Sequence, residues 1–171
     1  MALEVLTFAA AARIPVHWSG FWSELVRRSG GARQVTNWLI AQANARGFHG
    51  AFVNREEAID SWLTLEDVVV GLLMPHAELD ARVVKLVVRL LQSSQLDAAK
   101  LAFRARRERA DIALAWVLSL IPETERNPAV LSLAKLLRPP RGNAQVHFSY
   151  DSQRLVRRPA SKDHLWRAKQ S

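Results

Sequence analysis

The feature that most constrains the fold is the spacing of apolar residues, which follows a helical period almost continuously up to Arg138. Trp18, Phe21, Trp22 and Leu25 form the clearest stripe, at i, i+3, i+4 and i+7. Residues typical of helix starts and stops separate the periodic segments. The pattern predicts an all-α protein, an irregular bundle of about seven to nine helices built from antiparallel helical hairpins.

Start and stop signals divide the chain into helices. Asn54, Thr64 and Ser94 each precede an acid by three residues, which is typical of a capped helix start. Asn127 before Pro128 predicts a further start, because proline at the first helical position loses no hydrogen bond. Residues 48–53 are expected to form a loop. After an apolar first helix, the predicted helices span residues 19–29, 32–46, 54–63, 64–74, 78–92, 94–107, 110–121 and 128–138.

Residues 64–93 and 95–124 both have the pattern of a helix pair. An offset of 31 superposes Leu65 on Leu96 and Asp80 on Asp111. Helical-repeat scaffolds stack helix pairs of about this length, so a helical-repeat-like arrangement is one interpretation. An irregular bundle without repeats is the alternative.

Charge is concentrated at the C-terminal end. The chain has 24 Lys or Arg against 16 Asp or Glu, a net charge of +8, and residues 139–171 hold seven of these cations and two of the acids. We therefore predict a helical body over residues 1–138 and a basic, partly extended C-terminal extension over 139–171. Within the body, residues 1–53 are interpreted as a helix-turn-helix-like part and residues 54–138 as a helical-hairpin part.

Several classes of function are disfavoured by the composition. The chain has no cysteine, which removes zinc-thiolate sites, iron-sulfur clusters and cysteine nucleophiles, and a reducing cytoplasm is the expected location. No two histidines stand three or four residues apart, so no metal site is predicted. There is no glycine-rich phosphate loop and no segment long enough to span a membrane. We expect a non-enzymatic protein without a cofactor.

Isolated polar and aromatic residues have simple structural interpretations. The carboxylate pairs, among them Glu66 with Asp67, lie near predicted helix starts, where an acid complements the helix dipole. His17 and His76 lie beside prolines at helix junctions, where a structural role is expected. Five of the six tryptophans lie on or beside apolar stripes and are expected in the core, namely Trp18, Trp22, Trp38, Trp62 and Trp116.

Residues 23–39 have the layout of a helix, a glycine turn and a second helix. This layout is similar to helix-turn-helix DNA readers, in which the second helix enters the major groove. Arg33, Gln34 and Asn37 avoid the apolar stripe of the second helix and have side chains suited to base edges. They are candidate nucleic-acid contacts, and an ordinary helical hairpin is the alternative interpretation.

Two basic regions complete the candidate interface for nucleic acid. Arg104, Arg106, Arg107 and Arg109 surround Glu108 at a junction of two predicted helices, where arginine forks could bind phosphates. The C-terminal extension adds Arg154, Arg157, Arg158 and Lys162, with Trp166 as a candidate partner contact.

The sequence thus favours a protein that binds DNA or RNA mainly through phosphates. The rival interpretation is a protein-interaction or scaffold module whose tail docks on an acidic protein partner.

Overall fold

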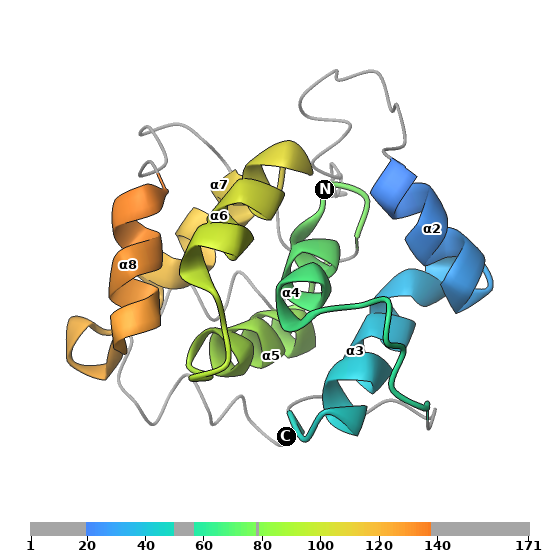
Figure 1. Cartoon of the computed structure of the whole chain (residues 1–171), viewed down its shortest axis with the longest axis horizontal. Coiled ribbons are helices and arrows are strands. Elements are labelled where there is room, and N and C mark those ends of the chain that lie inside the picture. Colours follow the sequence, from blue (N-terminus) through green and yellow to red (C-terminus); the bar gives the residue numbers. More distant parts are fainter. Residues whose placement is uncertain (1–19, 50–56, 78, 138–171) are drawn as a thin grey trace, which may run out of the picture.

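The computed structural model describes residues 20–49, 57–77 and 79–137. All regular structure in these ranges is helical, which confirms the all-α class for this part of the chain. Figure 1 shows the seven α-helices, which are α2 (Gly20–Ser29), α3 (Val35–Ala45), α4 (Leu65–Leu73), α5 (Ala81–Leu91), α6 (Ala98–Arg107), α7 (Asp111–Ser119) and α8 (Pro128–Leu136). Short 3-10 turns at Ala32–Gln34 and Glu123–Glu125 precede α3 and α8. The expected first helix and the C-terminal extension lie outside the described residues.

Two of the predicted helix starts are confirmed by their capping hydrogen bonds. The side chain of Thr64 accepts the Asp67 N–H, and the Asp67 carboxylate accepts the Thr64 N–H at 3.0 Å, which is a complete capping box. The Asn127 side chain accepts the N–H of Val130 at 2.8 Å, with Pro128 at the first helical position. Local sequence therefore determines where α4 and α8 begin.

The predicted start at Ser94 is wrong, because the capping residue of α6 is Asp97. Its Oδ1 accepts the N–H groups of Ala99 and Lys100, both at 3.0 Å, so the helix begins at Ala98. A carboxylate is as good an N-cap as a serine hydroxyl, and Asp97 was interpreted only as the third residue of a serine-capped turn. Asn54, the third predicted cap, lies outside the described residues.

The predicted helix over 54–63 is also wrong, since residues 57–63 have no helical structure. The side chains of Gln42 in α3 and of Arg46, which caps that helix, take up hydrogen bonds of this segment's backbone. The amide of Gln42 bonds the Ala58 carbonyl and the Asp60 N–H, both at 2.8 Å. The Arg46 guanidinium donates to the carbonyls of Asp60 and Leu63 at 2.8 and 2.9 Å. Tertiary contacts therefore override the local helical pattern.

Helix α4 lies in the middle of the described structure and packs against α3, α5, α6 and α7 (Figure 1). Its side chains are nearly all buried, and the hydrophobic core draws on all seven helices. Gly71 allows a close approach, because a Cβ atom there would lie 2.8 Å from Leu39 Cδ1 and 3.1 Å from Leu25 Cδ1. A side chain at this position would force the side chains of Leu39 and Leu25 to shift.

The two predicted helix pairs are present, α4 with α5 and α6 with α7, but their spacings differ. The N-caps of α4 and α6, Thr64 and Asp97, stand 33 residues apart, whereas those of α5 and α7, Asp80 and Ala110, stand 30 apart. The offset of 31 therefore aligns neither pair of starts. Among the described residues, none of the helices has the length and apolar character needed to cross a bilayer.

Candidate functional site

The predicted base-reading residues lie at the start of α3. Arg33 and Gln34 belong to the 3-10 turn and Asn37 to the first turn of the helix, and all three are exposed. The rest of α3 is mostly inside the protein, including Thr36 and Ile40. A recognition helix needs a continuous exposed face to enter a groove. Between Val35 and Ala43 only Asn37 is exposed, so α3 lacks such a face.

Arginines at the end of α2 are paired with acids. Glu24 receives hydrogen bonds from Arg27 Nε at 2.8 Å and Arg28 Nε at 2.5 Å, and Arg28 Nη1 also donates to Asp60 at 2.6 Å. These hydrogen bonds lower the pKa of Glu24 from 4.5 to about 2 and raise the pKa of both arginines. The positive charge of this helix end is therefore largely neutralised.

Asp60 also belongs to this network. Burial raises its pKa, but hydrogen bonds from the Trp62 N–H and the Arg28 guanidinium lower it below its ordinary value. The Arg28 guanidinium also lies 4.6 Å from the centroid of the Trp62 ring. Trp62 was expected in the core, but its side chain is 39% exposed. The expectation failed because it assumed the helix over 54–63.

Arg104 is held within the fold. Its Nε lies 2.9 Å from Asp67 Oδ1, and its guanidinium lies 4.8 Å from the centroid of the Phe21 ring. Asp67, expected only to complement the helix dipole, thus caps α4 and also ties α4 to α6. The structure places Arg104, which was predicted to contact nucleic acid, between a carboxylate and an aromatic ring.

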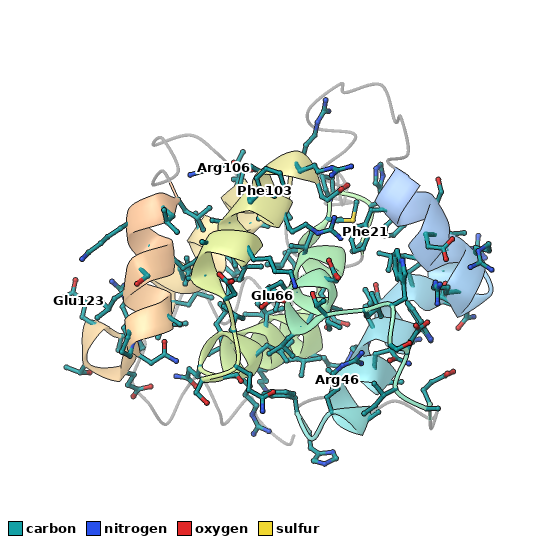
Figure 2. The ribbon with its side chains drawn as sticks, in the orientation of Figure 1. Phe21, Arg46, Glu66, Phe103, Arg106 and Glu123 are labelled. Carbon is teal, nitrogen blue, oxygen red and sulfur yellow. The ribbon has the colours of Figure 1, made fainter. Side chains whose placement is uncertain are left out.

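The other arginines at the end of α6 remain on the surface. Arg106, Arg107 and Arg109 are all exposed, and Arg106 donates to the Leu136 carbonyl in the last turn of α8. Phe103, one helical turn earlier, has 64% of its side chain exposed, and Figure 2 shows it with Arg106 along the same edge of the molecule. A carbonyl partner orients Arg106 without neutralising it. This end of α6 therefore presents cations beside an exposed aromatic ring.

Arg104 and Arg107 line a cavity of about 410 Å³. Four segments bound it: the start of α2, the segment before α4, α4 itself and the end of α6. The lining residues are Gly20, Phe21, Trp62, Asp67, Arg104, Arg107 and Glu108. The rings of Phe21 and Trp62 are stacked, with centroids 5.7 Å apart. Glu108 is the notable residue, because its side chain is only 2% exposed and its Oε2 accepts no hydrogen bond.

Sequence reasoning missed Phe21, Trp62, Phe103 and Glu108 as candidates for function. A local signal existed for Glu108, because a carboxylate at the end of a helix faces the negative pole of the helix dipole. The structure adds that the next residue, Arg109, has a φ of 60°, a conformation in which glycine is usual. For Phe21 and Trp62 no local signal existed, since their position depends on how distant segments pack.

Arg154, Arg157, Arg158, Lys162 and Trp166 lie outside the described residues, as does His17. His76 packs with its ring centroid 5.2 Å from that of Trp22, and burial lowers its pKa. Among the described residues, no three His, Asp or Glu side chains are grouped as a metal site would require.

Comparison with family models, curated proteins and solved structures gives no match for this chain.

Proposed function

We propose that this chain is a non-enzymatic cytoplasmic protein that binds single- or double-stranded nucleic acid mainly through phosphates. In this proposal the protein is an irregular bundle of helical hairpins with a basic C-terminal extension. The contacts come from the end of α6 and from Arg154, Arg157, Arg158 and Lys162 in the extension. The observation that supports the proposal best is the trio Arg106, Arg107 and Arg109 beside the exposed ring of Phe103.

The trio suits phosphate binding because its charge is incompletely compensated. Arg106 has a backbone carbonyl as its partner, and the ion pair between Arg107 Nε and Glu108 is 3.7 Å long. Arginine binds phosphate oxygens in a bidentate manner, and an aromatic ring such as Phe103 can stack on an unpaired base. The combination of exposed cations with an exposed ring is typical of surfaces that follow a nucleic-acid backbone.

Salt dependence tests the proposal. Fluorescence anisotropy of labelled DNA and RNA oligonucleotides, single- and double-stranded, is measured from low to moderate salt. Release of counterions makes the logarithm of affinity fall linearly with the logarithm of salt concentration, by about 0.7 to 0.9 per phosphate contacted. Binding of no oligonucleotide even at low salt would contradict the proposal.

A charge reversal identifies the surface. Arg107→Glu should weaken binding at least about tenfold and reduce the salt slope by about one contact. Arg82→Glu is the matched control, since Arg82 is an exposed arginine at the start of α5 and an acid is tolerated in a first turn. Equal losses in the two variants would mean that net charge, and no particular surface, determines affinity. Arg157→Glu with Arg158→Glu tests the C-terminal extension in the same assay.

One observation favours the rival function, a protein-interaction module. Leu131 and Leu136 on α8 are 46% and 40% exposed, and α8 packs against α6, which carries the exposed Phe103. Exposed apolar side chains on adjoining helices are typical of protein-binding surfaces. Phe103→Ala separates the two functions. Loss of affinity for single strands but not for duplexes supports base stacking, whereas unchanged affinity for every oligonucleotide leaves the ring to a protein partner.

A further inference from the structure

We infer that the cavity between α2 and α6 binds the base of a guanine nucleotide, with Glu108 as the residue that recognises its edge. The inference rests on the proposed function, because it names one base that the protein would select within a single strand. The cavity of about 410 Å³ lies within the usual range for ligand pockets, about 300 to 1,000 Å³. It lies directly beside the arginines proposed to bind phosphate.

Glu108 is the first argument for a ligand. Its carboxylate is almost fully removed from water, Oε2 accepts no hydrogen bond, and the nearest cationic nitrogen, Arg107 Nε, is 3.7 Å from Oε1. The residue also follows the last turn of α6, where the helix dipole disfavours a negative charge. A buried acceptor without a donor is costly to the fold. A ligand that supplies N–H groups would offset that cost.

The other charges of the cavity restrict what the ligand can be. Asp67 is already saturated, since Oδ1 accepts from Arg104 and Oδ2 from the N–H and hydroxyl of Thr64. The two carboxylates and two guanidiniums that line the cavity cancel in charge. Neither a simple cation nor a simple anion is therefore favoured. The complementary ligand has neutral N–H donors for Glu108 and a separate anionic group for Arg107.

Guanine has the matching edge among the common bases. Its N1–H and N2–H₂ groups are two adjacent donors, with the spacing of the two oxygens of a carboxylate. Adenine and cytosine place an acceptor beside their single amino group, and uracil flanks its N3–H with two carbonyls. Unpaired bases are generally recognised by hydrogen bonds to this edge and by stacking on aromatic rings. Here recognition falls to Glu108, because the faces of Phe21 and Trp62 already pack on each other and under the guanidiniums of Arg104 and Arg28.

Arg107 connects the base to the phosphate. Its side chain is 66% exposed, and its Nε lies 3.7 Å from Oε1 of Glu108. A base reaches Oε2 when this side chain turns outward, and in that position the guanidinium can pair with the nucleotide phosphate. Phosphate binding and base recognition are thereby coupled. Arg104 stays in place, because Asp67 and the Phe21 ring hold it.

The test compares three nucleotides with the full chain by calorimetry. Guanosine monophosphate should bind more tightly than inosine monophosphate, which keeps N1–H but lacks the amino group, and both more tightly than adenosine monophosphate. Glu108→Gln should lower affinity for guanosine monophosphate by about tenfold or more and remove its preference over adenosine monophosphate, because an amide replaces one acceptor by a donor. Equal affinities for the three nucleotides in the wild-type chain would overturn the inference whatever the variant does.

The control variant is Glu123→Gln, which removes a charge at an exposed position in the turn before α8; Figure 2 shows Glu123 on the opposite side of the molecule from Phe21, which lines the cavity. It should bind guanosine monophosphate as the wild-type chain does. A loss equal to that in Glu108→Gln would assign the effect to net charge and overturn the inference.

Oligonucleotides distinguish failure of the pocket from failure of the proposed function. A uridine oligomer and the same oligomer with one central guanosine are compared across a salt series. Salt-dependent binding of both without discrimination would overturn the pocket and leave the proposed function intact. Tight, guanine-selective binding of the mononucleotide, with no gain for the oligomer, would support the pocket and contradict a nucleic-acid backbone interface. Absence of binding to either ligand would overturn both.

Discussion

The ends of α2 and α6 share a backbone hydrogen bond and a residue with positive φ, and they differ in their surroundings. In each, an N–H bonds the carbonyl five residues earlier, from Gly31 to Val26 and from Ala110 to Ala105. In each, the preceding residue has positive φ, 86° at Gly30 and 60° at Arg109. Both ends thus form the same kind of C-terminal cap.

When the caps of α2 and α6 are matched residue by residue, their arginines coincide but their acids do not. Arg27 and Arg28 of α2 match Arg106 and Arg107 of α6, but Glu24, which binds both arginines of α2, matches the exposed Phe103. In α6 the nearby acid is Glu108, which is buried and makes only a long contact with Arg107. Two similar basic helix ends therefore differ because an acid three or four residues earlier neutralises one of them. Counting arginines along the sequence does not reveal this difference.

The largest effect is expected from removing the long-range acid of the α2 end. Asp60→Ala leaves Arg28 without its 2.6 Å partner and the Trp62 N–H without its acceptor. Because the Arg28–Asp60 contact is partly buried and the Trp62 N–H loses its acceptor as well, we expect a loss of about 2 kcal/mol in the free energy of unfolding. Urea denaturation measures it, with Glu123→Ala at an exposed position as the control. A change within error of the control would mean that this helix end does not depend on its acids.

An opposite change is expected at the α6 end. Glu108→Gln removes a buried charge without altering side-chain shape, so the free energy of unfolding should rise by about 1 kcal/mol. The urea midpoint should increase at constant slope. Together with the expected loss of guanine binding, this result would show stability given up for a binding site. A destabilised variant would instead mean that the carboxylate supports the fold and would remove the contrast between the two ends.

Replacing the left-handed residue of the α6 end should have a smaller effect. Arg109→Gly adopts the same positive φ without the strain of a side chain, as Gly30 does in α2, and should stabilise the protein by about 0.5 kcal/mol. Arg109→Ala removes the same charge and keeps the strain, which makes it the matched control. Thermal unfolding distinguishes the two variants, and equal melting temperatures would indicate that the φ at this position has no energetic cost.

The smallest effect is expected from acid titration of the α2 end, because exposed ion pairs contribute little to stability. The pKa of Glu24 is lowered by its hydrogen bonds with Arg27 and Arg28 from 4.5 to about 2. A carboxylate with a depressed pKa stabilises the fold above its unfolded value, and this contribution disappears as the pH falls from about 4.5 to about 2. Melting temperatures of the wild-type chain and Glu24→Gln should therefore converge on acidification, and a constant difference would contradict the assignment.

Two helix starts whose determinants are local were predicted correctly. The cap at Thr64 and the proline after Asn127 lie within one helical turn of the helices they start, and both predictions are confirmed. The segment before α4 was predicted wrongly because Gln42 and Arg46, far away in sequence, bond its backbone. A helical pattern carries no information about such partners.

The candidate site was only partly predictable for the same reason. The arginines near Glu108 were recognised as a group, but their different roles follow from the packing of α4 and α8 against α6. Asp67 neutralises Arg104, and the carbonyl of Leu136 orients Arg106. The cavity requires four separate segments to meet around Phe21 and Glu108. None of these encounters leaves a periodic signal in the sequence.

The central position of α4 has a consequence for the dynamics of the protein. Because α4 packs against α3, α5, α6 and α7, its amide hydrogens become accessible to solvent deuterium only when most of the molecule opens. Its exchange should be the slowest of the seven helices and should report global unfolding. Occupation of the cavity, to which Asp67 of α4 contributes, should then slow deuterium uptake in helices that the ligand never touches.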